Sequence, residues 1–242
     1  MSINKVILHP AFVLHTRPYR DTSLLVELFT KQDGRLTVVA RSARGMKSRF
    51  KWILMPFLPL LVSFSGKTDL RSLQQAEVNG QSYELKHDTL LSGFYLNELL
   101  MRLLHSHEAY PKVYQAYQNT LADLACSKMP EVELRLFEMC LLSNLGYGLH
   151  LDKTMGNDPV LPEKQYAFEF GCGLCQAKAN HPSNFLGKNL LALHRGDLSN
   201  KEELRDAKRL LRPVLANLLG NKPLKSRELF GSKICNCKPA GK

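Results

Sequence analysis

The chain has 242 residues, of which 44% are hydrophobic and 23% charged, and its formal net charge is +11. This length suits one or two domains with a core large enough to fold without a disulfide or a metal. No window offers about 18 uncharged apolar residues, and the start of the chain lacks the basic region of a signal peptide. We therefore expect a cytoplasmic protein with six reduced cysteines and no membrane contact.

The positive charge is concentrated at the two ends of the sequence. Residues 1–80 carry a net charge of +7 and residues 201–242 another +7, whereas residues 81–165 carry −4. Local basic clusters mark a surface that contacts a polyanion, because each neutralised phosphate releases condensed counterions. The alternative is charge that serves solubility alone. The pattern favours nucleic acid as the partner.

The first 80 residues show the two-residue alternation of β-strands. Thr22–Lys31 and Arg35–Ala40 alternate on either side of the turn Asp33-Gly34, which predicts a hairpin. Five short strands with no helix-length pattern between most of them predict a closed barrel of the OB type, because closure leaves no exposed edge. The other strands are expected over Val6–Thr16, Leu60–Phe64 and Leu70–Val78, the last with a bulge.

From about residue 86 the sequence follows the period of amphipathic helices. Asp88 is expected to cap the first helix, and Pro111 and Pro130 fit the first turns of the next two. A fourth helix follows Ser199-Asn200, and Pro213 is expected to kink or split it, because proline deletes a backbone donor.

The region between the third and fourth helices is rich in Gly, Pro and Asn, with one strand-like run at Tyr166–Phe170. The sequence as a whole therefore predicts an α+β protein. An OB-fold DNA-binding domain is expected at residues 1–80 and a helical domain at 81–242. Residues 146–195 of the latter form an irregular insertion with a hairpin.

A basic segment without acidic residues begins in the third strand and continues into a Ser- and Gly-containing loop that ends at Phe50 and Trp52. A mobile basic loop beside aromatic rings suits a single strand, because cations contact phosphates while rings stack on bases. In the alternative interpretation the loop is merely solvated and Trp52 lies in the core, where tryptophan is common. Mutual repulsion of the cations favours phosphate contact. These cations are Arg35, Arg41, Arg44, Lys47, Arg49 and Lys51.

A second basic element lies near the end of the chain. Lys222, Lys225 and Arg227 are expected to point outward, while Leu224 anchors the segment. We predict that these cations also contact nucleic acid. The alternative is an exposed start of a helix, because Lys and Arg are mostly solvated in any case.

Cys172 and Cys175 have the spacing of a zinc knuckle. A structural zinc site needs four ligands, and the remaining candidates, His181, His194 or the pair Cys235 and Cys237, do not have a standard spacing. The alternative is two small apolar residues in a hairpin. We predict no bound metal and no cofactor.

No catalytic motif is present. The run from Ser65 to Thr68 resembles the tail of a P-loop, but Leu61 stands where glycine is needed and a strand follows instead of a helix. Acidic residues are scarce where the cations gather, which argues against a two-metal nuclease. We therefore expect a protein that is not an enzyme.

Arg135 lies on the third helix beside an apolar face that includes Val132, Leu136 and Phe137. An apolar groove with one arginine is suited to an acidic peptide that ends in a carboxylate. The alternative is an ordinary surface arginine.

Four segments in order resemble the RecO recombinational repair family, and most closely its gamma-proteobacterial forms. The first, AFVLHTRPYRDTSLLVELFTKQDGRLTVVARSARGMKS, resembles the amino-terminal barrel of that family. The likeness extends over nearly the whole chain. The other three segments are Phe94–Leu100, Asn144–Gly148 and Lys222–Phe230.

The resemblance implies a barrel followed by a helical domain that binds single- and double-stranded DNA and anneals complementary strands. It further implies action with RecR to help RecA replace single-strand-binding protein (SSB) on gapped DNA. Arg41–Lys51 matches the region of the barrel that contacts DNA, and Arg135 matches a position where the acidic SSB tail docks. Many members carry a four-cysteine zinc module, of which only Cys172 and Cys175 remain here.

We therefore hypothesise a monomeric, non-catalytic DNA-binding mediator of recombination that acts at the nucleoid. Annealing would follow from cations that hold two polyanions together, and binding should be tolerant of sequence and steeply dependent on salt. Three rivals remain: an RNA-binding OB-fold factor, a metal-dependent nuclease, and a structural adaptor whose acidic middle binds protein.

Overall fold

The computed structural model describes residues 8–66, 70–177, 184–220 and 222–226. The described chain forms two compact units. One contains the residues up to Ser127 together with Leu224–Ser226, and the other contains Lys128–Pro223. Among the described residues, no helix has both the length and the apolar character needed to cross a bilayer.

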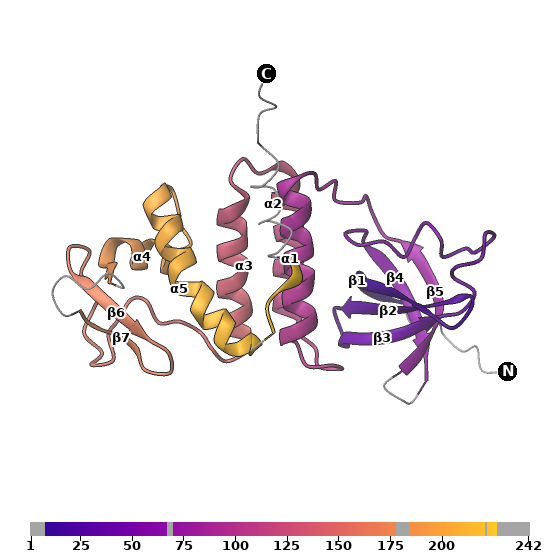
Figure 1. The fold of residues 1–242 in the computed structure, drawn as a ribbon, viewed down its shortest axis with the longest axis horizontal. Coiled ribbons are helices and arrows are strands. Elements are labelled where there is room, and N and C mark those ends of the chain that lie inside the picture. The colour runs from indigo at the N-terminus through magenta and orange to yellow at the C-terminus, as the bar shows by residue number, and fades with distance from the viewer. Residues whose placement is uncertain (1–7, 67–69, 178–183, 221, 227–242) are drawn as a thin grey trace, which may run out of the picture. The chain divides into compact units, whose positions relative to one another are not determined.

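Five strands of the first unit close into a barrel (Figure 1). The strand order is β1-β2-β3-β5-β4, with β1 and β4 paired antiparallel and β3 and β5 paired parallel. This closed five-stranded arrangement confirms the predicted barrel. The expected bulge is present in β5. Ser63 pairs with Gln75 and Phe64 pairs with Leu73, so Gln74 is the extra residue. The strands are β1 His9–Tyr19, β2 Ser23–Thr30, β3 Gly34–Ala40, β4 Leu60–Ser65 and β5 Leu70–Val78.

The predicted hairpin joins β2 and β3 through Asp33 and Gly34. Gly34 has a φ of +64°, and a Cβ placed there would lie 1.6 Å from the backbone oxygen of Glu108. The amide of His107 also donates to the carbonyl of Arg35 at 2.8 Å. Glycine at this position therefore allows the hairpin turn to approach the segment that follows the first helix.

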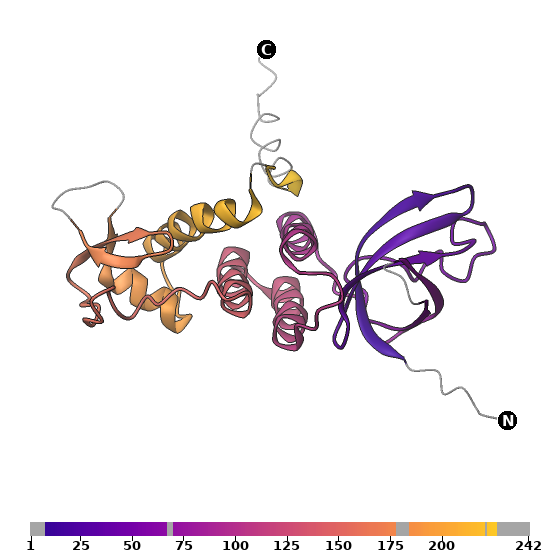
Figure 2. The ribbon, with the colours of Figure 1, turned by 90° about the horizontal axis from the view of Figure 1, so that it is seen from below.

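Helices α1 (Asp88–Leu103) and α2 (Pro111–Cys126) complete the first unit and lie side by side (Figure 2). The side chain of Asn97 in α1 donates to the carbonyl of Leu14 in the barrel at 3.0 Å and accepts from the Tyr117 hydroxyl of α2 at 2.6 Å. Burial raises the pKa of Tyr117 well above its ordinary value, so this hydroxyl stays a donor. Aromatic contacts of Phe12 and Phe29 with α2 cover the same part of the barrel wall.

Two of the predicted helix starts are confirmed and one is corrected. Pro111 and Pro130 occupy the first turns of α2 and α3 as expected. Asp88, in contrast, is the first helical residue of α1 and not its cap: the cap position belongs to His87, without a capping side chain. The carboxylate of Asp88 still lies in the first turn, where it complements the positive end of the helix dipole.

The second unit combines three helices with a three-stranded antiparallel sheet of order β7-β6-β8. The predicted strand at Tyr166–Phe170 is present as β6, and the hairpin with β7 is present as well. A helix over Gly187–Arg195 was not predicted, because its nine residues are too few to show the helical period. The elements are α3 Pro130–Asn144, β6 Gln165–Glu169, β7 Gly173–Gln176, β8 Phe185–Leu186, α4 Gly187–Arg195 and α5 Lys201–Leu219.

Helix α5 begins as the sequence predicts but does not end or split at its proline. The Asn200 side chain accepts from the amide of Glu203, and the Glu203 carboxylate accepts from the amide of Asn200, which forms a capping box. The helix continues through Pro213 to Leu219 as one element. Val214 and Leu215 directly after the proline are buried, so packing of this face outweighs the missing backbone bond.

Candidate nucleic-acid interface

The basic loop, residues 41–52, follows β3 and is folded into consecutive turns. The amides of Gly45, Ser48 and Lys51 donate to the carbonyls of Ser42, Gly45 and Ser48. The amide of Arg44 donates to the carbonyl of Thr22 at 2.9 Å, which fastens the loop to the turn between β1 and β2. The loop is therefore a defined part of the barrel surface.

Buried apolar side chains decide which way the loop faces. Ala43 and Phe50 of the loop, with Leu54 just after it, belong to the same core cluster as the inward residues of the strands. Their burial turns the charged positions between them toward solvent. The exposed cations are Arg41, Arg44, Lys47, Arg49 and Lys51.

The charges of these five cations are not neutralised within the described part of the chain, where no carboxylate pairs with any of them. Arg44 donates to the carbonyls of Arg20 and Asp21 at 3.4 and 3.2 Å, and Arg49 donates to the carbonyl of Gln74 at 2.6 Å. These bonds orient two guanidinium groups but leave their charges available. The basic loop thus presents positive charge without counter-charge, which is the electrostatic requirement for binding phosphates.

Two further cations lie near this surface and were not singled out from the sequence. Arg17 and Arg20 are exposed at the end of β1 and in the turn to β2, which contacts the loop through Arg44. The guanidinium of Arg20 lies 5.3 Å from the centre of the Tyr19 ring. The signal was present as two arginines just before a turn between strands, the connection that OB folds use for oligonucleotides.

Arg35 differs from the other predicted cations because its guanidinium is engaged within the first unit. Its Nη1 pairs with the Glu27 carboxylate at 3.3 Å, its Nε donates to the Leu104 carbonyl at 3.2 Å, and its Nη2 donates to the Ser106 hydroxyl at 2.8 Å. The side chain is 21% exposed. Arg35 therefore joins the barrel to the end of α1, and we leave it out of the interface.

Trp52 is exposed, so the interpretation that placed it in the core is wrong. Its side chain has 74% of its surface exposed, and the Nζ of Lys51 lies 5.1 Å from the ring centre. The core position in this part of the chain is taken by Phe50 instead. One large aromatic surface thus lies among the cations of the loop.

The second basic element is only partly described. Lys222 and Lys225 are exposed as predicted and Leu224 is buried, whereas Arg227 lies outside the described residues. The amides of Lys225 and Ser226 each donate to the Glu98 carboxylate at 2.9 Å, and the Ser226 hydroxyl donates to it at 2.6 Å. Partial burial raises the pKa of Glu98, but these hydrogen bonds and the charge of Arg102 together lower the pKa below its ordinary value. The carboxylate therefore fixes the backbone beside Lys225 and leaves that side chain outside.

Arg135 of α3 is buried and is not an ordinary surface arginine. Its guanidinium pairs with the carboxylate of Glu138, one turn further along the helix, at 2.8 Å. The two side chains are 10% and 0% exposed. Any peptide carboxylate that approached Arg135 would compete with this internal partner.

Two protein-family models match this chain, and together they cover most of both units. The family "Recombination protein O N terminal" matches residues 2–81, and "Recombination protein O C terminal" matches residues 86–228. The chain belongs to the RecO family of DNA repair proteins. Its membership accounts for the order of the four sequence segments noted above.

Several curated RecO proteins cover almost the whole chain. A DNA repair protein RecO of Coxiella burnetii is 48% identical over 229 residues, which are 93% of this chain and 98% of the relative. The RecO of Actinobacillus pleuropneumoniae is 43% identical, covering 94% and 96%. The RecO of Methylococcus capsulatus is 42% identical, covering 95% of each.

In this RecO chain, Cys172 and Cys175 lie in the hairpin of β6 and β7, at the turn and in β7 respectively. Burial, with the charges of Glu169 and Cys172, raises the pKa of the Cys175 thiol above its ordinary value. No cluster of three or more His, Cys, Asp or Glu side chains suited to a metal occurs in the described ranges. His181, Cys235 and Cys237 lie outside the described residues.

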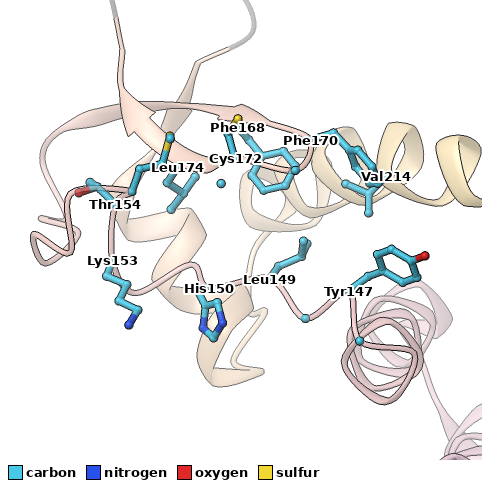
Figure 3. A pocket seen from close by; sticks show the side chains of 15 residues that line it. Tyr147, Leu149, His150, Lys153, Thr154, Phe168, Phe170, Cys172, Leu174 and Val214 are labelled. Atoms are coloured by element: carbon cyan, nitrogen blue, oxygen red, sulfur yellow. The ribbon is translucent and has the colours of Figure 1, made fainter.

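The second unit also contains a pocket of about 420 Å³ (Figure 3). It is formed by the segment that follows α3, by the β6–β7 hairpin and by Val214 of α5. Apolar side chains predominate, with His150 and Lys153 on one side. Cys172 contributes to this lining. The labelled lining residues are Tyr147, Leu149, His150, Lys153, Thr154, Phe168, Phe170, Cys172, Leu174 and Val214.

Proposed function

We propose that this protein is a non-catalytic DNA-binding mediator of recombination, and that the basic loop is its main contact with the DNA backbone. The observation that supports this most strongly is the exposure of all five loop cations without a carboxylate partner among the described residues. The family membership supports DNA over other polyanions. Arg17 and Arg20 extend the same surface.

The chemistry of this surface favours binding over bond cleavage. Guanidinium and ammonium groups donate hydrogen bonds to phosphate oxygens and neutralise their charge, but neither group acts as a base or a nucleophile at neutral pH. Phosphate contacts carry no sequence information, so binding should be tolerant of sequence. Neutralising the phosphates of two strands reduces the repulsion that slows their pairing, which provides a route to annealing.

The partners follow from the family and are part of the proposal. We propose that the protein binds single- and double-stranded DNA and acts with RecR to help RecA replace SSB. Lys222, Lys225 and Arg227 are proposed to provide a second contact with DNA. Recognition of the SSB tail by Arg135 stays a prediction, and the pairing with Glu138 means that it requires competition with an internal carboxylate.

The decisive experiment compares two double variants. Arg41→Ala/Lys47→Ala removes two exposed loop cations, and Lys86→Ala/Lys112→Ala removes two exposed cations outside the loop. We expect the loop variant to lower the slope of log K against log salt for single-stranded DNA by about 1.4, because each lost phosphate contact accounts for about 0.7. The control should leave the slope unchanged. Equal slopes in all three proteins would exclude the basic loop as the interface.

A second readout tests the proposed function itself. The same proteins are added to complementary strands coated with SSB, and the rate of duplex formation is measured. We expect annealing by the wild type and the control and slower annealing by the loop variant. Tighter binding to an RNA oligonucleotide than to DNA of the same sequence would support the RNA-binding alternative instead.

A further inference from the structure

The exposed indole of Trp52 contributes little to the folding of the loop. Phe50 and Leu54, two positions to either side, are 5% and 7% exposed, whereas Trp52 is 74% exposed. Burial of a large aromatic side chain is favourable, so an indole left in water forgoes stabilisation that its neighbours obtain. The amides of Ile53 and Leu54 both donate to the carbonyl of Phe50 at 3.2 Å. This turn holds the indole away from the core.

The indole and the cations beside it suit the base and the phosphate of one nucleotide, respectively. Lys51 Nζ lies 5.1 Å from the ring centre, and Arg49 lies 4.8 Å over the neighbouring Phe50 ring. Both cations are exposed and without a carboxylate partner among the described residues. A ring that stacks on a base, next to a cation that meets the phosphate of the same nucleotide, is the recurring arrangement in proteins that bind single strands.

We propose that Trp52 stacks on an unpaired base of DNA held by the basic loop, so that this residue makes the loop prefer single strands to duplex. The inference rests on the proposed function, since the loop must first bind the backbone. In a duplex the faces of the bases are covered by their neighbours, so the indole finds no free surface there. The phosphates are available in both forms, so the cations alone would not discriminate between them.

The chain provides its own probe for this contact, because Trp52 is its single tryptophan. Fluorescence excited where tyrosine does not absorb therefore reports on this loop alone. We expect strong quenching by oligothymidine, and little change with an abasic oligonucleotide of equal length or with duplex DNA. Equal quenching by the abasic and the thymidine strands would overturn the proposal, because it would show that phosphate contact is sufficient.

Binding by variants gives an independent test. Trp52→Ala should weaken binding of oligothymidine about tenfold, the typical cost of losing one stacked base, and should leave binding of the abasic strand unchanged. Trp52→Phe should retain most of the affinity. Met46→Ala is the matched control, because Met46 lies on the same loop, is apolar and is 90% exposed. Circular dichroism verifies that each variant is folded.

The possible failures can be told apart. Unchanged oligothymidine binding by Trp52→Ala would overturn stacking and leave the DNA-binding function intact. Equal losses for the thymidine and abasic strands would assign Trp52 to the shape of the loop and also overturn stacking. Absence of binding to any strand by the wild type would overturn the proposed function and the inference together.

Discussion

The basic loop and helix α3 both contain arginines that the sequence predicts to bind anions, but those of the loop are exposed and that of α3 is buried. The loop cations, Arg44 among them, are exposed and keep their charge available. Arg135 in α3 is buried against the carboxylate of Glu138. An arginine beside apolar residues is therefore exposed in one place and part of an internal ion pair in the other.

The difference arises from the way each segment meets its core. In the loop, Phe50 enters the core and the residues on both sides of it are turned outward. In α3 the helical period places residues three apart on one face, so Arg135 and Glu138 are buried together. The position of the nearest buried side chain therefore decides whether a cation is exposed to solvent. Measurements on four variants test this difference.

The largest effect is expected at Arg135. Arg135→Ala removes the arginine that pairs with a fully buried carboxylate, and we expect a loss of about 3 kcal/mol in the free energy of unfolding. Denaturant unfolding followed by the helical signal measures it. Arg135→Ala combined with Glu138→Gln should recover part of the loss, because the buried charge is then gone. A loss below 0.5 kcal/mol, about the size of an ordinary surface substitution, would show that the pair is not structural.

Arg35 should behave as a structural arginine although it belongs to the basic segment. Arg35→Ala removes an ion pair with Glu27 and hydrogen bonds to Leu104 and Ser106, so we expect about 1–2 kcal/mol of destabilisation. Arg35→Lys should not restore the stability, because an ammonium does not reproduce the fork of three donors. The salt slope of DNA binding should stay unchanged in the folded variant, and a reduced slope would return Arg35 to the interface.

Arg44 should show the reverse behaviour. Arg44→Ala should lower the salt slope for single-stranded DNA by about 0.7. Its stability should change by no more than about 0.5 kcal/mol, because the substitution lies on the surface. Titrations at several salt concentrations measure the first quantity and denaturant unfolding the second. A large loss of stability with an unchanged salt slope would show that Arg44, like Arg35, has a structural role and does not contact DNA.

The smallest effect concerns Glu98, which holds the backbone at Lys225. Its pKa in the folded protein is lowered, so its contribution to stability is complete above the ordinary value of 4.5 and is lost as the pH falls through the folded value. The difference in the free energy of unfolding between the wild type and Glu98→Gln should therefore stay constant from neutral pH down to 4.5 and narrow below 4.5. Unfolding at a series of pH values tests this. A constant difference would assign the effect of the variant to packing instead of charge.

Much of the fold could be predicted from local patterns. Alternation and β-favouring composition located the five barrel strands, and Asp33-Gly34 located the hairpin turn, because each signal depends on neighbouring residues alone. Asn200 and the two prolines located three helix starts for the same reason. The helices were predicted less well where contacts between residues far apart in the sequence determine the structure. Pro213 was expected to kink or split α5, and the helix is not split because Val214 and Leu215 are buried. Helix α4 was too short for its period to be recognised.

Local sequence patterns were enough to predict most of the elements in order, the concentration of positive charge after the third strand and, through four segments, the resemblance to RecO proteins. Only the tertiary structure decided which charged and aromatic side chains face water. Exposure depends on what packs from far along the chain, and no local period contains that information. Arg35 is held at the end of α1, Arg135 is buried with Glu138, and Trp52 is exposed because Phe50 fills the core.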